Sequence, residues 1–168
     1  RMALDTIRLV SQNIYAVDKD PKDLKAREGL MLAATLGGLA FSNASICLVH
    51  GMSRPLGSNF KVPHGLSNAM LLPTITEFSI EHAKSRYADC SRAGNFAHPE
   101  DSDDVACDKL IKGLYKINND FEVKPKNFEE ELENMATDAE NSGATNLNPR
   151  VPSGNEMVDL YGQAWRAF

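Results

Sequence analysis

A long stretch without charge constrains the fold of this chain more than any other feature. Residues 29–53 contain no Asp, Glu, Lys or Arg. A membrane span needs roughly 20 mostly apolar residues, but this stretch also carries Thr35, Ser42 and His50, with no basic flank or aromatic belt at either end. Small and polar residues at this density favour a helix that other helices surround. We therefore predict a buried central helix and no membrane partner.

The remaining sequence predicts further helices with short breaks. Apolar residues recur at the three- and four-residue steps of a helix in four segments, residues 3–17, 65–85, 105–115 and 128–140. Pro73 is expected to kink or divide the second of these. Ser153 and Glu156 have the spacing of a capping box at the start of a last helix. No alternating β-branched run occurs, so the predicted fold class is all-α.

Composition narrows the class of protein. The chain has 168 residues, 42% of them hydrophobic, which suits one helical domain over residues 1–168 with a real core. A formal net charge of −5 and the lack of a basic run argue against a nucleic-acid partner. Three cysteines without a CxxC pair indicate reduced thiols in a cytoplasmic protein. No N-cap precedes the first helical pattern, so we expect the natural chain to begin upstream.

Two of the four histidines are candidates for metal binding. His82 and His98 lie in charged or polar surroundings, which favours the surface. His50 is expected to end the uncharged helix, and His64 to lie in the first turn of the next one. On one straight helix these two would be roughly 21 Å apart, but the glycines and prolines of residues 51–63 can break the helix and return the chain. Spacing alone leaves open a shared metal or two structural histidines, and no GxGxxG or P-loop motif provides a nucleotide site.

A family resemblance adds to this pattern. Residues 38–78 read GLAFSNASICLVHGMSRPLGSNFKVPHGLSNAMLLPTITEF, residues 2–10 read MALDTIRLV and residues 148–165 read NPRVPSGNEMVDLYGQAW. These segments resemble the second half of the iron-containing (group III) alcohol dehydrogenases. The resemblance implies the multi-helix C-terminal domain of the dehydroquinate synthase-like fold. It also implies that an α/β dinucleotide-binding domain precedes this domain in the family and is absent from this chain.

The resemblance implies a specific metal site and reaction. In this family one Asp and three His hold a divalent metal, usually Fe²⁺ and sometimes Zn²⁺. Two of these ligands match His50 and His64, and the resemblance implies that the other two would precede residue 1. The implied reaction is hydride transfer between a small alcohol or aldehyde and NAD or NADP, with the metal polarising the alcohol oxygen. A homo-oligomer is expected from the family, and this chain by itself is expected to bind metal poorly and to be inactive. The alternatives are a glycerol or diol dehydrogenase of the same superfamily and a non-catalytic helical association module.

Two further residues are candidates through the resemblance. Many relatives carry a His where this chain has Arg54, and an arginine stays protonated and cannot relay a proton. We hypothesise that Arg54 presents a fixed charge to the cofactor or to an acidic substrate group; an ordinary cation at a helix end is the alternative. Phe41 matches a position that lines the substrate pocket in relatives, although a core phenylalanine would also explain it.

Overall fold

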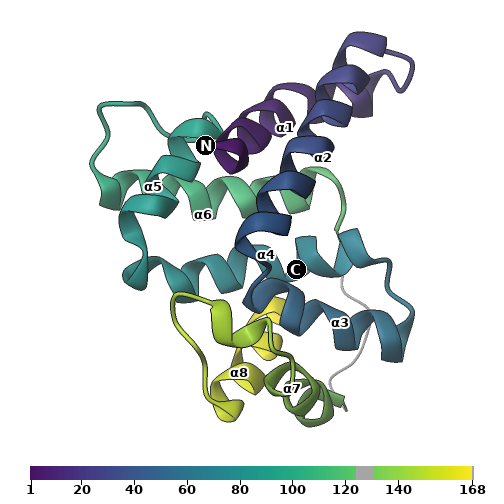
Figure 1. The fold of residues 1–168 in the computed structure, drawn as a ribbon, viewed down its shortest axis with the longest axis vertical. Helices are drawn as coiled ribbons and strands as arrows, with labels where there is room; N and C mark the ends of the chain where they lie inside the picture. The colour runs from purple at the N-terminus through teal and green to yellow at the C-terminus, as the bar shows by residue number, and fades with distance from the viewer. Residues whose placement is uncertain (124–130, 168) are drawn as a thin grey trace. The chain divides into compact units, whose positions relative to one another are not determined.

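The structure is a computed structural model, and it describes residues 1–123 and 131–167. These residues form helices and no strand, which confirms the all-α prediction (Figure 1). In chain order the elements are α1 (Met2–Lys19), α2 (Leu24–Ala44), α3 (Leu48–Phe60), α4 (His64–Ser79), η1 (Ile80–His82), α5 (Lys84–Ala93), α6 (Asp103–Asp120), α7 (Leu132–Glu140), η3 (Thr145–Leu147) and α8 (Gly154–Arg166). The predicted start of α7 at residue 128 lies outside the described residues.

The chain divides into two compact units. The first unit comprises Arg1–Ser45 and Lys84–Leu110, and the second comprises Ile46–Ala83 and Ile111–Phe168. The first unit therefore holds α1, α2, α5 and the start of α6. The second unit holds α3, α4, α7, α8 and the rest of α6. Each unit is described by itself below.

In the first unit, α1 and α2 pack side by side (Figure 1). Gly29 of α2 lies directly against Asn13 of α1, where an added Cβ would come within 2.5 Å of the amide nitrogen. Asp23 begins α2 because its side chain accepts a hydrogen bond from the amide of Ala26 at 3.0 Å. Small residues thus allow close helix approach, as the sequence indicated.

The second unit contains the hydrophobic core. α3 packs against α4 and α7, and α8 packs against α4 and α7. The buried residues at these contacts are Leu48, Met52, Leu56, Val62, Met70, Leu71, Ile75, Met135, Ala136, Ala139, Met157, Leu160, Tyr161 and Ala164. Tyr161 donates its buried hydroxyl to the carbonyl of Met52 at 2.6 Å, which ties α8 to α3. The capping box of Ser153 and Glu156 starts α8, as predicted.

The prediction of one buried central helix over residues 29–53 is wrong. The chain leaves helical geometry at Ser45, whose φ of 68° is left-handed, and a new helix begins at Leu48. Of the residues in α2, Ala26 and Ala33 are buried, whereas larger apolar side chains are exposed, namely Leu24, Met31, Leu32, Leu39 and Phe41. No single helix in the described part of the chain is long and apolar enough to cross a membrane; α2 and α3 meet that criterion only when counted together.

Of the two outcomes expected at Pro73, a kink or a division of the helix, the division does not occur, because another residue compensates for the proline. α4 continues through Pro73 to Ser79. Proline lacks the N–H that would bond to the carbonyl four residues earlier, which is that of Ala69. The buried side chain of Asn118 donates to this carbonyl at 2.7 Å instead. The backbone oxygen that the proline would leave unpaired is therefore satisfied from α6.

Candidate metal centre

His50 and His64 lie at the starts of two consecutive helices of the second unit. His50 is in the first turn of α3 rather than at the end of the uncharged helix, and His64 is the first residue of α4, as predicted. The expected break between residues 51 and 63 occurs near the end of that segment, because α3 continues to Phe60. The chain reverses just afterwards, where Lys61 has a left-handed φ of 54° and Val62 is buried in the core. This reversal returns the start of α4 to the start of α3.

The reversal brings the two imidazole rings together. The ring centroids of His50 and His64 are 5.2 Å apart, and the ring planes are tilted by 53°. A metal ion bonds imidazole nitrogen at about 2 Å, so one ion can reach a nitrogen of each ring at this separation. The structure therefore brings together the two histidines that the sequence singled out.

Both histidines are held at the backbone by a buried serine three residues later. Ser53 donates to the carbonyl of His50 at 3.2 Å, and Ser67 donates to the carbonyl of His64 at 2.9 Å. Both serines are fully buried. Because the serine side chains cannot move into solvent without losing these bonds, the first turns of α3 and α4 are fixed relative to the core.

Asn68 is a further neighbour of His64 that the sequence analysis did not identify. Its amide nitrogen donates to the His64 carbonyl at 2.9 Å and lies 3.1 Å from Nε2 and 3.4 Å from Nδ1 of the ring. Its buried Oδ1 has no hydrogen-bond partner among the described residues. The spacing of four residues from His64, one helical turn, is the only sequence signal for this contact.

The surroundings of His50 favour its neutral form. Burial lowers the pKa of His50 below its ordinary value, and the nearby positive charges of His64 and Arg54 lower the pKa further. A neutral imidazole is the form that binds a metal. The donor set of two nitrogens therefore fits iron or zinc equally well.

The two histidines supply only part of a metal site. In the described residues, no group of three or more His, Cys, Asp or Glu side chains lies close enough to hold an ion. His82 and His98 are exposed, as predicted, and lie outside the pair. All three cysteines are free thiols, Cys47, Cys90 and Cys107. A complete site at His50 and His64 would need ligands from elsewhere.

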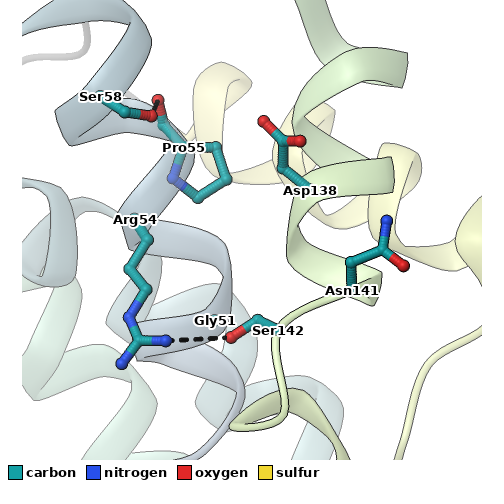
Figure 2. Close-up of a pocket in the computed structure, with 7 residues that line it drawn as sticks. All are labelled: Gly51, Arg54, Pro55, Ser58, Asp138, Asn141 and Ser142. Carbon is teal, nitrogen blue, oxygen red and sulfur yellow. Dashed lines mark hydrogen bonds between the residues drawn. The ribbon is translucent and has the colours of Figure 1, made fainter.

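Arg54, one turn after His50 on α3, lines a cavity whose lining also includes Gly51, the residue after His50. The cavity has a volume of about 350 Å³ and is lined by Gly51, Arg54, Pro55, Ser58, Asp138, Asn141 and Ser142. Figure 2 shows the Arg54 side chain running toward Gly51 and Ser142, while the carboxylate of Asp138 points elsewhere. Arg54 donates to the Ser142 hydroxyl at 3.4 Å. Sequence reasoning missed the residues of this cavity after residue 130, because only folding brings the end of α7 to α3.

Phe41 lies in the last turn of α2 and belongs to the first unit, whereas both histidines belong to the second. Its side chain is 56% exposed, so it is not a core phenylalanine. Its assignment to a substrate pocket stays a prediction.

The described residues form an all-helical domain in which the imidazoles of His50 and His64 lie side by side. The model of the Fe-containing alcohol dehydrogenase family, C-terminal, matches residues 1–165. The chain therefore belongs to this family, which confirms the family predicted from the sequence.

Individual relatives agree with this assignment. Lactaldehyde reductase from Escherichia coli (strain K12) is 29% identical over 97% of this chain and 43% of its own length. Alcohol dehydrogenase 4 from Saccharomyces cerevisiae (strain S288c) is 30% identical with the same coverage. Among solved structures, 1,3-propanediol oxidoreductase has a TM-score of 0.91 and 28% identity, covering 97% of this chain and 44% of its own. The chain spans less than half the length of these relatives.

Proposed function

We propose that this chain is the helical, metal-binding part of an NAD(P)-dependent alcohol dehydrogenase or aldehyde reductase. The observation that supports this proposal most directly is the pair of imidazoles from His50 and His64, 5.2 Å apart at the starts of α3 and α4. Family membership supports the same reading over a non-catalytic association module. In this proposal residues 1–168 act as one metal-binding domain.

His50 and His64 would supply two nitrogen ligands to a divalent metal, Fe²⁺ or Zn²⁺. When bound, the metal would act as a Lewis acid toward the alcohol oxygen. In the overall reaction a hydride leaves the alcohol carbon for the oxidised nicotinamide and the hydroxyl proton is released, which gives an aldehyde, reduced nicotinamide and a proton. The remaining ligands and the nicotinamide site would lie outside this chain. We therefore propose that residues 1–168 alone are inactive.

The other candidate residues take supporting roles in this proposal. Arg54 would hold a fixed positive charge one helical turn from His50, where a histidine could instead relay a proton. Phe41 would contribute apolar surface to the substrate pocket. A small alcohol or aldehyde is the proposed substrate, a homo-oligomer the proposed assembly, and the cytoplasm the proposed location, which the free cysteines support.

A diol or hydroxyaldehyde is the second candidate substrate class. The relatives named lactaldehyde reductase and 1,3-propanediol dehydrogenase act, by their names, on compounds with two oxygen functions. A preference of the gene product for 1,2-propanediol over 1-propanol would favour this class.

The test of the proposal is a metal and activity assay of the gene product that contains this chain. We expect nicotinamide reduction with a primary alcohol that a chelator abolishes. His50→Ala and His64→Ala are each expected to remove most of the bound metal and at least about 99% of the activity. His82→Ala, which changes an exposed histidine of the same unit, is the matched control. Full metal content in His50→Ala or His64→Ala would contradict the proposal.

A further inference from the structure

The guanidinium of Arg54 has more hydrogen-bond donors than the described residues use. Among the residues that the structure describes, its side chain makes one hydrogen bond, at 3.4 Å to Ser142, and no ion pair. A guanidinium carries several donors in a fixed fork that matches a carboxylate. The nearest carboxylate in the cavity, that of Asp138, points away from it (Figure 2). The described residues therefore leave most of the hydrogen-bond donors of Arg54 unused.

The direction of the side chain places this charge beside the metal ligands. Long side chains in a helix lean toward its N-terminus, and Arg54 runs back along α3 toward Gly51, the residue after His50. A substrate whose reacting oxygen lies at the two histidines would thus have the rest of its chain near Arg54.

The cavity sets the size of the group that Arg54 can receive. Its volume of about 350 Å³ suits a short acid and is small for a dinucleotide. Asp138 in the same cavity disfavours a doubly charged phosphate more than a single carboxylate. Residues four apart on a helix are separated by about 6 Å along its axis, and the Arg54 side chain turns back toward Gly51, so a short carbon chain would join the two positions. These limits favour a substrate carboxylate over a cofactor phosphate.

We propose that Arg54 selects short substrates that carry a carboxylate a few carbons from the reacting alcohol or aldehyde. This inference rests on the proposed function and names its substrate class. The carboxylate takes no part in bond making or breaking, and it orients the chain by a forked contact with the guanidinium. The hydroxyl of Ser142 and the amide of Asn141 line the cavity and can share the same carboxylate.

The test compares two substrates of equal length in the complete gene product, namely 4-hydroxybutyrate and 1,4-butanediol. We expect kcat/KM to favour the acid by about tenfold, and Arg54→Gln to reduce this preference by about tenfold, chiefly through KM. Arg54→Lys keeps the charge without the fork and is expected to retain part of the preference. Arg166→Gln, at an exposed position near the end of α8, is the matched control and should leave the preference unchanged.

A binding measurement separates this inference from the proposed function. Butyrate, an unreactive acid, should bind the wild type and bind Arg54→Gln about tenfold more weakly by calorimetry. Turnover of 1,4-butanediol without any preference for the acid would overturn the carboxylate assignment and leave the proposed function standing. An effect of Arg54→Gln confined to the KM of the nicotinamide would also overturn it. Butyrate binding that depends on Arg54, with no turnover of either alcohol, would support the anion site and contradict the proposed function.

Discussion

The two compact units differ in what they bury. The second unit encloses large side chains such as Leu56, Met52 and Tyr161, all fully buried. In the first unit most of the fully or nearly buried side chains are small, notably Ala26, Ala33, Ala88 and Ala106. Because burial of large apolar side chains contributes most of the hydrophobic stabilisation, the second unit has much the stronger core.

The units also differ in the polar interactions that hold them. In the first unit, α5 and the start of α6 are joined by exposed or partly exposed ion pairs, Arg92–Asp103 at 2.7 Å and Lys84–Asp104 at 2.6 Å. Pairs of this kind contribute about 1 kcal/mol or less. In the second unit the hydrogen bond of Tyr161 is buried, and the fully buried residues Ser53 and Ser67 make part-buried ones. The candidate metal ligands thus lie in the unit that can hold them rigidly.

The largest difference in the free energy of unfolding is expected when one leucine in each unit is replaced by alanine. Leu56→Ala removes a side chain that is 0% exposed and leaves a cavity, so we expect a loss of about 3 kcal/mol in the free energy of unfolding. Leu24→Ala changes a side chain that is 80% exposed and should alter stability by less than about 0.5 kcal/mol. Urea unfolding followed by circular dichroism measures both, and the fluorescence of Trp165 reports on the second unit. Equal effects of the two substitutions would refute the contrast.

The next largest difference in the free energy of unfolding is expected when one glycine in each unit is replaced by alanine. A Cβ at Gly51 would lie 2.3 Å from the hydroxyl of Thr145, which is itself held by a 2.7 Å hydrogen bond to the Ala139 carbonyl. Gly51→Ala is therefore expected to cost about 1–3 kcal/mol. Gly38 in α2 has open space at this position, so Gly38→Ala should stabilise by up to about 1 kcal/mol. The comparison fails if urea midpoints show Gly51→Ala to be as stable as the wild type.

Replacing Tyr161 by phenylalanine is expected to lower the free energy of unfolding by a smaller amount, and this loss should depend on pH. Tyr161→Phe removes the hydrogen bond to Met52 and is expected to cost about 1 kcal/mol at pH 7. Burial raises the pKa of Tyr161 in the folded state, and the charge of Asp138 raises that pKa further. The tyrosine of the unfolded chain therefore ionises at a lower pH than that of the folded chain. The contribution of Tyr161 to the free energy of unfolding is complete below about pH 10 and declines above it, by up to about 1.4 kcal/mol per pH unit. Urea titrations at pH 7 and pH 11 should show a shallower decline in the variant, and parallel declines would contradict the role of Tyr161.

The last comparison is between two asparagines that make the same local hydrogen bond. Asn68 donates to the His64 carbonyl at 2.9 Å, and Asn43 of the first unit donates to the Leu39 carbonyl at 2.7 Å, each four residues back. Asn68→Ala is expected to weaken metal binding by the gene product about tenfold, because it frees His64. Asn43→Ala should leave the affinity unchanged. Competition with a coloured chelator measures the metal affinity of both variants. Equal metal affinities would show that Asn68 does not support the candidate site.

Much of the fold could be predicted from the sequence, because its local signals are strong. The capping box at Ser153 and the apolar spacing of α6 both mark real helix boundaries or faces. The break at Ser45 could not be found, because no glycine or proline marks it and the uncharged composition continues through it. Pro73 gave a misleading signal, since its effect is offset by Asn118, a residue far along the chain.

The sequence predicted the two histidines of the candidate site, but not the residues around them. The spacing of His50 and His64 allowed a chain reversal, but it did not fix one, and the family resemblance was needed to favour a shared metal. The actual reversal depends on the left-handed Lys61 and on burial of Val62. The neighbours Asp138, Asn141 and Ser142 carry no motif, because their place in the cavity follows from the packing of α7 on α3.

Native mass spectrometry without chelator tests the central claim most directly, because it reports chain and bound metal together. For the gene product that contains this chain, we predict one divalent metal per chain, lost in His64→Ala and retained in His82→Ala. For residues 1–168 alone we predict no stoichiometric metal, since His50 and His64 supply only two ligands. One tightly bound metal on residues 1–168 alone, or a metal in the gene product that survives His64→Ala, would contradict the assignment.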